Sequence, residues 1–275
     1  MSESIPRHST RPDARLTRRS LVAAAGVLAA VGPVAASKAL AFSSSKAPKF
    51  NWTGGENCQT KCALCFLRGT RLLTPDGEVA IEALKIGDVV TTHGGETRAV
   101  RWIGRIEISR AEGWDRDVLP VRISKDALGR GVPQRDLYVS RAHMLYLNGV
   151  LVPVADLING ATIAIVSPDV ETLQYFHIEL GSHDVVVAEG APCESLLATP
   201  TSLKAFDNHT EYEAFCGHLP PLDARPYAPI AAYNGGRGEL KSRLRSALAP
   251  VVDIRRPLDV VRDNIEARAL LSKAA

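Results

Sequence analysis

Turn-forming residues interrupt the sequence at short intervals from Cys65 onward, and this is the feature that most restricts the possible folds. The turn signals in this region are Pro75-Asp76-Gly77, Ile86-Gly87-Asp88, Gly94-Gly95, Asn148-Gly149, Asn159-Gly160 and Gly181-Ser182. Glycine and asparagine accept the positive backbone angles that tight hairpin turns require. A chain interrupted this often leaves no room for long helices, so residues 65 to about 200 must consist of short elements.

The runs between these turns alternate in the manner of half-buried strands. Apolar residues separated by one polar or small residue are Val121 and Ile123, Leu137 and Val139, and Phe176, Ile178 and Leu180. Successive side chains of a strand point to opposite faces, so this alternation places one face in a core. Only Ala80 to Leu84 and Val154 to Leu157 suggest single helical turns. The sequence therefore predicts an all-β domain of many short strands, which we expect to span residues 65–205.

The first 41 residues have the features of an export signal. A basic region ends in the pair Arg18-Arg19, an apolar stretch runs from Leu21 to Ala36, and Ala39-Leu40-Ala41 offers a cleavage site. The arginine pair is typical of a twin-arginine signal. The apolar stretch is interrupted by Gly32-Pro33 and is shorter than the roughly 20 residues of a spanning helix. We expect a bacterial protein exported to the periplasm or beyond, with no stable membrane span after processing.

Two regions flank the predicted β domain. Residues 42–64 are polar and lack apolar periodicity, which predicts a flexible N-terminal arm. Residues 206–275 contain several prolines and then two stretches of helix-forming residues, Glu239 to Leu248 and Leu258 to Leu271. Leucines at positions 240, 244 and 248 suggest an amphipathic helix. Whether this Pro-rich and helical tail packs on the domain is left open by the sequence.

The charge balance argues against a polyanionic partner. The chain has 33 Lys and Arg residues against 30 Asp and Glu residues, a formal net charge of +3. Much of the positive charge lies in the first twenty residues and in the tail, whereas nucleic-acid-binding proteins concentrate it on a binding face. We therefore expect no nucleic-acid partner.

Three cysteines, Cys58, Cys62 and Cys65, have the spacing C-x3-C-x2-C just before the β domain. This spacing resembles the cluster-binding loop of radical S-adenosylmethionine enzymes, and thiolates are the usual ligands of iron–sulfur clusters. Those enzymes continue with alternating strands and helices, which the short strands predicted here do not match. A zinc site would need a fourth ligand, for which Cys193, His143 or His183 are available. A metal-binding protein built on the cysteine triplet is one alternative function.

Three blocks of sequence carry a different resemblance. Cys65 opens CFLRGTRLLTPDGEVAIEALKIGDVV, Ser140 and His143 form S-x-x-H within DLYVSRAHMLYLNG, and His183 lies in YFHIELGSHDVVVAEG. In this order the blocks resemble those of the Hint domain, which hedgehog autoprocessing domains and inteins share. The second block of that family usually reads T-x-x-H, so Ser140 keeps the hydroxyl and loses a methyl group. The late block also resembles that of bacterial members in which AEG is followed by Glu-Ser, here Glu194-Ser195.

The resemblance implies self-cleavage beginning at Cys65. The Cys65 thiol would attack the Leu64 carbonyl through a five-membered ring and replace the peptide bond by a thioester. Because the leaving group is the Cys65 α-nitrogen, it needs a proton, and His143 fits that role. The Ser140 hydroxyl would orient the same bond. No cofactor is implied.

The second step differs from protein splicing in this interpretation. Inteins finish with a His-Asn pair, whereas the chain after Gly190 reads Ala-Pro-Cys-Glu-Ser, and no sterol region of the hedgehog type is recognisable in the tail. We therefore expect water or another small nucleophile to resolve the thioester, activated by His183 or Asp184. The chain's own N-terminal arm, residues 42–64, would be both substrate and product.

Two further hypotheses concern the inactive states of such a domain. The fold could have lost its chemistry and act as a secreted interaction module. Alternatively, Cys58 or Cys62 could form a disulfide with Cys65 and hold the domain inactive until it is reduced, because only the thiolate attacks. Of the other cysteines, Cys193 is expected in the core and Cys216 at the surface or in a disulfide, and Trp102 and Trp114 are expected to pack.

Overall fold

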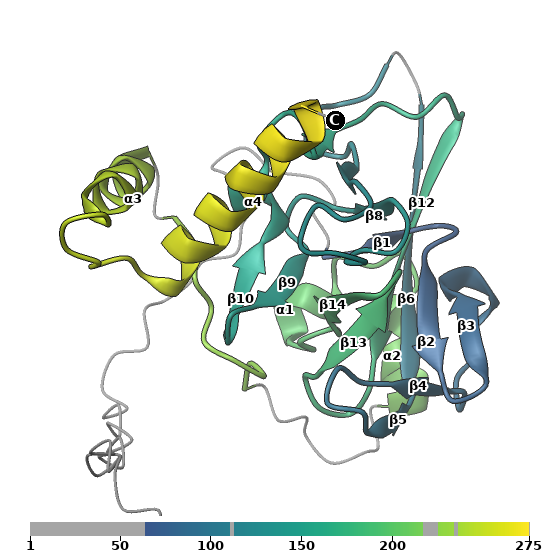
Figure 1. Cartoon of the computed structure of the whole chain (residues 1–275). Helices are drawn as coiled ribbons and strands as arrows, with labels where there is room; N and C mark the ends of the chain where they lie inside the picture. The colour runs from purple at the N-terminus through teal and green to yellow at the C-terminus, as the bar shows by residue number, and fades with distance from the viewer. Residues whose placement is uncertain (1–63, 111–112, 217–224, 234–235, 275) are drawn as a thin grey trace, which may run out of the picture. The chain divides into compact units, whose positions relative to one another are not determined.

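The computed structural model describes residues 64–110, 113–216, 225–233 and 236–274, all within the unit Asn51–Ala275 (Figure 1). The predictions for the export signal, and for the arm up to residue 63, lie outside the described residues. No helix among the described residues is long and apolar enough to cross a membrane.

The described chain contains fourteen strands. They are β1 (Phe66–Leu67), β2 (Arg71–Thr74), β3 (Gly77–Ala80), β4 (Val89–Thr91), β5 (Thr97–Ala99), β6 (Trp102–Ser109), β7 (Val121–Ile123), β8 (Leu137–Val139), β9 (Met144–Leu147), β10 (Val150–Pro153), β11 (Ile163–Ile165), β12 (Thr172–Glu179), β13 (Val185–Ala188) and β14 (Ala191–Glu194). Two short 3-10 helices, η1 (Ile81–Ala83) and η2 (Val154–Leu157), occupy the predicted helical turns.

The strands form two six-stranded sheets and a two-stranded ribbon. The first sheet has the order β11-β7-β8-β1-β12-β6, the second has the order β10-β9-β14-β13-β2-β3, and β4 pairs with β5. The pairing of these strands is antiparallel throughout. The predicted all-β class with many short strands is therefore confirmed.

Two of the hairpins show how the turn residues set the register. Asn148 and Gly149 have φ values of 50° and 80° between the paired residues Leu147 and Val150. Glu189 and Gly190, with φ values of 48° and 79°, connect β13 to β14 in the same way. Two consecutive positive φ values give a turn whose twist matches that of the flanking strands.

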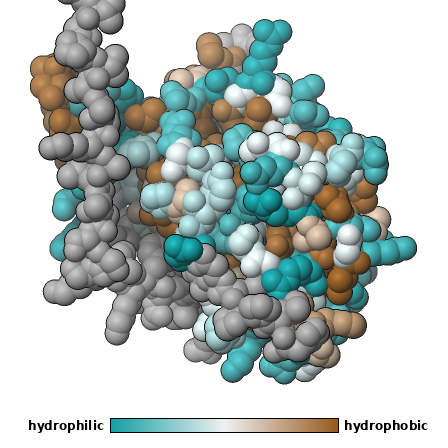
Figure 2. All heavy atoms as spheres, turned by 90° about the horizontal axis from the view of Figure 1, so that it is seen from below, coloured by the Kyte–Doolittle hydropathy of each residue, from teal (hydrophilic) through white to brown (hydrophobic). Residues whose placement is uncertain are grey.

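The core has two main parts. The larger part takes side chains from both six-stranded sheets, including Phe66, Leu72, Leu145 and Ile178. The smaller part lies on the other side of β6 and β12. There, Trp102, Leu173 and Tyr175 pack with residues of the helical segment that follows β14 in the chain. On the face seen in Figure 2, hydrophilic and hydrophobic residues are interspersed, as expected when the larger apolar side chains are mostly internal.

The burial of β12 differs from the sequence prediction because both faces of this strand are covered. The prediction placed Phe176, Ile178 and Leu180 on one buried face. Phe176 is only partly buried, whereas Tyr175 and Leu173 of the opposite face are almost fully buried. The reason is the helical segment that packs over this face, which alternation within the strand cannot reveal.

Four α-helices follow the strands within the described residues. They are α1 (Pro200–Leu203), α2 (His209–Cys216), α3 (Gly236–Leu248) and α4 (Pro257–Ala274). The helical tail is thus confirmed, and α4 packs on the domain beside β10, with Leu258, Val261 and Ile265 in the larger core (Figure 1). The coil before α3 is also attached, because the Tyr233 amide donates to Asp156 Oδ2 at 2.8 Å.

The three leucines whose spacing predicted an amphipathic helix lie in α3, and they are largely exposed. Leu240, Leu244 and Leu248 are 60%, 56% and 52% exposed. The fully buried residue of this helix is Ser242, whose hydroxyl donates to Asp259 of α4 and accepts from the Arg262 guanidinium. Polar groups rather than a leucine stripe therefore join α3 to α4.

The prediction that Cys216 lies at the surface or in a disulfide is wrong. This residue is a free thiol, 6% exposed, and it packs in the smaller core cluster together with Trp102. Its position at the end of α2 faces β6, which explains the burial. Cys193 is fully buried and Trp102 and Trp114 pack in the core, as predicted.

Gly104 marks the closest approach of the helical segment to β6. A Cβ atom at this position would lie 2.5 Å from the Phe206 ring. We expect Gly104→Ala to lower the free energy of unfolding by about 1–3 kcal/mol, because a rigid ring must move. Urea unfolding would measure the change. Gly94→Ala is the control, since its Cβ would meet only Thr92 Oγ1 at 3.8 Å, and equal losses for the two variants would contradict the packing argument.

Candidate functional site

Cys65 lies directly before β1, and the strand register determines its neighbour. Phe66 pairs with Val139 of β8, so the residue after Val139 lies opposite Cys65 in the antiparallel ladder. That residue is Ser140. The Cys65 amide donates to Ser140 Oγ at 2.8 Å, and the Ser140 amide donates to the Cys65 carbonyl at 2.8 Å. Ser140 therefore holds the nitrogen of the Leu64–Cys65 peptide bond.

The Cys65 side chain is fully buried in the smaller core cluster, among residues that include Trp102 and Tyr175. Burial raises the pKa of the thiol well above its usual range, and the negative charge of Glu194 raises it further. The thiol is therefore protonated at neutral pH. To become a nucleophile it needs a base that takes its proton.

His143 follows Ser140 in a tight turn, with the His143 amide donating to the Ser140 carbonyl at 3.2 Å. Its ring is fully buried and lies against Phe66, with 4.3 Å between the ring centroids. Burial, with a smaller contribution from His183, lowers the pKa of His143 to about 3. The imidazole is therefore neutral at pH values near 7.

His177 lies on β12, opposite Gly104 of β6. Its ring is fully buried, with its centroid 5.2 Å from that of His143. Burial lowers the pKa of His177 well below its usual value, and His143 and His183 lower it further. Within the described part of the chain, no ring nitrogen of His143 or His177 has a hydrogen-bond partner.

Glu194 is the last residue of β14 and is fully buried. Its Oε1 accepts from the Met144 amide at 2.8 Å, and its Oε2 lies 3.3 Å from His183 Nε2. His183 Nδ1 accepts from the Tyr227 amide at 3.0 Å. Nδ1 therefore carries no proton, so a neutral His183 donates through Nε2 to Glu194. Burial raises the pKa of the Glu194 carboxyl.

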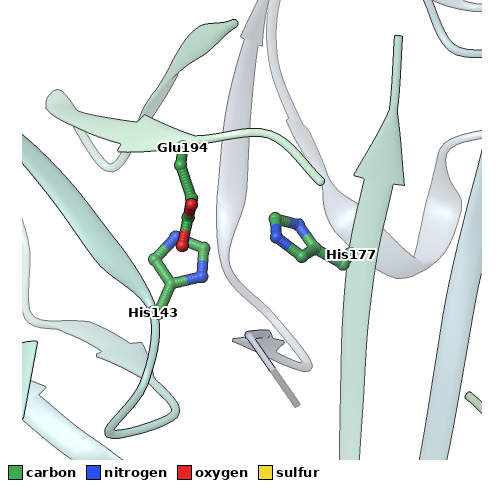
Figure 3. Close-up of side chains that lie close together, drawn as sticks. All are labelled: His143, His177 and Glu194. Atoms are coloured by element: carbon green, nitrogen blue, oxygen red, sulfur yellow. The ribbon is translucent and has the colours of Figure 1, made fainter. Parts of the chain in front are cut away.

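His143, His177 and Glu194 come together in one buried cluster (Figure 3). One nitrogen or oxygen of each lies within 4.8 Å of the others. His143 comes from the loop between β8 and β9, His177 from β12, and Glu194 from β14, so residues from both sheets meet here. Two neutral imidazoles with a carboxylate can move protons or bind a metal ion.

Asp184 does not join this cluster. Its carboxylate forms an ion pair with Arg98 at 3.1 Å and accepts from the Val185 amide at 2.8 Å. Its own amide donates to Ser195 Oγ at 2.9 Å. These contacts fix the start of β13, so Asp184 acts as a structural residue in this arrangement.

The sequence analysis missed His177 and Glu194 as members of the site. A signal existed for each: both are ionisable residues in mostly apolar sequences, YFHIEL and APCES. Such residues are rarely buried without a partner or a role. Of the predicted site residues, Cys65 and Ser140 are in direct contact, His143 lies in the cluster, and His183 lies beside it through Glu194. Cys58 and Cys62 lie outside the described residues, so the predictions for the cysteine triplet and its disulfides stay predictions.

Acid should destabilise the protein through His143. An unfolded histidine has a pKa near 6.5 and binds a proton that the folded state, with a pKa of about 3, excludes. Its contribution to stability is therefore complete above about pH 6.5 and is lost progressively as the pH falls towards about 3. The slope approaches about 1.4 kcal/mol per pH unit inside that range.

Urea unfolding of the parent and of His143→Gln between about pH 4 and 7 measures this effect. The variant should lose stability less steeply on acidification than the parent. Comparing the two slopes removes the opposing contribution of Glu194, whose raised pKa is present in both. Parallel curves would show that His143 is not held neutral.

Residues 64–200 match the model of the family described as Hint domain. With the two sheets described above, this match confirms the predicted Hint fold for this part of the chain. A search of curated proteins finds no match.

Several solved structures are similar to a little under half of the chain. A bacterial intein-like domain from Clostridium thermocellum is 18% identical, covers 48% of this chain and 96% of its own, and has a TM-score of 0.33. The MchDnaB-1 intein is 16% identical, with 46% and 98% covered and a TM-score of 0.33. A DnaB intein from Synechocystis sp. PCC 6803 is 12% identical, with 48% and 98% covered and a TM-score of 0.32.

Proposed function

We propose that the Hint domain over residues 64–200 cleaves its own chain between Leu64 and Cys65, through an N-to-S acyl shift and without splicing. The observation that carries this proposal is the pair of hydrogen bonds between Ser140 and Cys65. One of them is donated by the Cys65 amide nitrogen, which belongs to the peptide bond that the Cys65 thiol would break. The buried His143 in the adjoining turn supplies a neutral imidazole.

In the first step, His143 takes the proton of the Cys65 thiol, and sulfur forms a bond to the Leu64 carbonyl carbon. The tetrahedral centre then loses its bond to the Cys65 nitrogen, which receives the proton from His143. The products are a Leu64 thioester and a free α-amino group on Cys65. The proton is only moved, so a neutral imidazole in a neutral site is suited to the task. Among the described residues, the ring nitrogens of His143 have no hydrogen-bond partner, so its lone pair is available.

In the second step, water attacks the thioester carbonyl. The carbon–sulfur bond breaks, sulfur regains a proton, and Leu64 becomes a carboxyl terminus. Glu194 is the group available to accept the proton of water, because its buried carboxylate acts electrostatically on the Cys65 thiol. His183 holds that carboxylate through its Nε2 proton. The sequence analysis expected His183 or Asp184 in this role, and the Asp184 carboxylate is engaged by Arg98.

Splicing is not part of the proposed reaction. The chain from Ala191 to Thr199 contains no asparagine that could cyclise. It continues from β14 into α1, and the Ser195 hydroxyl accepts a hydrogen bond from Asp184 inside the fold. The arm before Cys65 is therefore the proposed product, and residues 1–41 are proposed to direct twin-arginine export.

Ser140→Ala tests the contact that carries the proposal. The variant leaves the Cys65 amide without its acceptor, and we expect cleavage to slow by about 10- to 100-fold, the rate equivalent of about 1–3 kcal/mol. The rate of appearance of the Cys65 amino terminus would be followed by mass spectrometry. Ser140→Thr is the matched control, because it keeps the hydroxyl and should retain most of the rate. Equal slowing in both variants would contradict a role for the hydroxyl.

A further inference from the structure

We propose that residues 225–233, which we call the strap, position the base of the hydrolytic step through the Tyr227 amide. This amide holds His183 in the tautomer whose Nε2 proton binds Glu194, so the Glu194 carboxylate stays ionised and can take a proton from water. The role rests on the proposed function. It gives a part in cleavage to a segment of the tail that lies beyond the matched residues 64–200.

The strap runs along β10, which is the end strand of the second sheet. The Leu151 amide donates to the Pro229 carbonyl at 2.9 Å, and the Ala231 amide donates to the Leu151 carbonyl at 2.8 Å. Leu151 and Ile230 thereby form a parallel bridge. An edge strand offers unpaired backbone groups, and an extended segment that pairs with them extends the sheet. Main-chain hydrogen bonds therefore fix the strap to the domain.

Packing and a further hydrogen bond add to this attachment. Ala228 and Ile230 pack against the small apolar cluster formed by β9, β10 and β13. At the other end of the strap, the Tyr233 amide donates to Asp156 Oδ2 at 2.8 Å. Tyr227 directly precedes the attached residues, so its amide is held in place.

The Tyr227 amide determines which nitrogen of His183 carries the proton. Its N–H donates to His183 Nδ1 at 3.0 Å, which requires a lone pair on Nδ1. The proton of the neutral ring is then on Nε2, 3.3 Å from Glu194 Oε2. The His183 side chain is fully buried, so bulk solvent does not reach either nitrogen.

The other tautomer would disable the base. With the proton on Nδ1, the bare Nε2 would face Glu194 Oε2, and their lone pairs would repel unless a proton lay between them. Burial already raises the pKa of the Glu194 carboxyl, so Glu194 would hold that proton. A protonated carboxyl cannot accept a proton from water. By accepting only the first tautomer, Tyr227 keeps Glu194 ionised.

The proton balance of hydrolysis shows why this matters. As the oxygen of water bonds to the Leu64 carbonyl carbon, the proton of water passes to Glu194. As the carbon–sulfur bond breaks, the same proton passes to the Cys65 sulfur. Glu194 begins and ends ionised, and His183 keeps its Nε2 proton throughout. The strap therefore acts on the second step, whereas the acyl shift uses His143.

The test is Tyr227→Pro in the full chain, because proline has no amide proton. Hydrolysis of the thioester by water should slow by about 10- to 100-fold, a part of the about 10²- to 10⁴-fold that a positioned base contributes. Cleavage by added hydroxylamine should stay near the parental rate, because this stronger nucleophile does not need the base. Mass spectrometry follows both reactions. A general loss of packing would slow both, and would exclude the positioning role.

Two controls separate the hydrogen bond from other effects of the substitution. Ala228→Pro places a proline beside Tyr227, where among the described residues the replaced amide makes no hydrogen bond. Tyr146→Leu removes the contact between the Tyr146 and Tyr227 rings, whose centroids are 5.4 Å apart, and leaves the Tyr227 amide. Both variants should hydrolyse the thioester as the parent does. Slowing in either that equals the slowing in Tyr227→Pro would contradict a role for the amide.

Long-range proton–nitrogen NMR correlations of the His183 ring provide a second readout that does not depend on cleavage. The proton should be on Nε2 in the parent and should move, in part or fully, to Nδ1 in Tyr227→Pro. Circular dichroism first confirms that the variant is folded, and the parent's spectrum alone overturns the role of the strap if the proton is on Nδ1. Parental hydrolysis in Tyr227→Pro also overturns it. A parent that hydroxylamine does not cleave contradicts the proposed function, and the proton positions in the two spectra then decide the effect of the strap on His183.

Discussion

Cys65→Ala is expected to abolish cleavage between Leu64 and Cys65. The reaction begins with a sulfur nucleophile that is part of the bond's own residue, and no other thiol can form the five-membered ring. The folded protein should be retained, because alanine fits within the volume of the buried cysteine. Intact-mass spectrometry over time would measure the loss.

Cys216→Ala provides the matched control for this variant. Cys216 is also a buried free thiol and packs in the same core cluster as Cys65. It has no part in the proposed reaction, so this variant should cleave at the parental rate. Cleavage at the same position in Cys65→Ala would exclude the acyl shift and would indicate an external protease.

His143→Gln should slow cleavage by about 10²- to 10⁴-fold, the usual contribution of a positioned proton carrier. The thiol of Cys65 has a raised pKa and cannot ionise unaided at neutral pH. Without the imidazole, no group in the adjoining turn takes that proton and returns it to the leaving nitrogen. The rate would be measured by the same mass assay after the variant's fold is confirmed by circular dichroism.

His209→Gln is the control for His143. The His209 ring contacts the Phe206 carbonyl at 3.1 Å in the helical segment, away from the buried cluster. This variant should cleave normally. A His143→Gln protein that is folded and as fast as the parent would assign the proton transfer to another group, with His177 as the next candidate because its ring is adjacent.

Local signals in the sequence predicted much of this fold. Turn pairs such as Asn148-Gly149 lie where the hairpins turn, and alternating residues such as Val121 and Ile123 lie in the expected strands. The S-x-x-H spacing also places Ser140 and His143 within one turn. In each case the deciding interaction is between residues close in the chain, which is why the pattern is informative.

The remaining features depend on contacts between distant segments. Glu194 reaches His143 and His177 only because β14 pairs with β9 and the two sheets pack together. The leucines of α3 have amphipathic spacing but are exposed. The contact of α3 with α4 is made instead by the buried Ser242. Cys216 is buried because α2 covers β6. Neither composition nor periodicity encodes which elements meet.

Hydroxylamine trapping tests the central claim most directly. The purified mature chain, kept reduced, would be treated with hydroxylamine and analysed by mass spectrometry. A Leu64 thioester predicts two fragments: an arm ending in a Leu64 hydroxamate, and a domain beginning with a free Cys65 amino group. A folded chain that stays intact under these conditions, or is cut at any other bond, would contradict the proposed acyl shift.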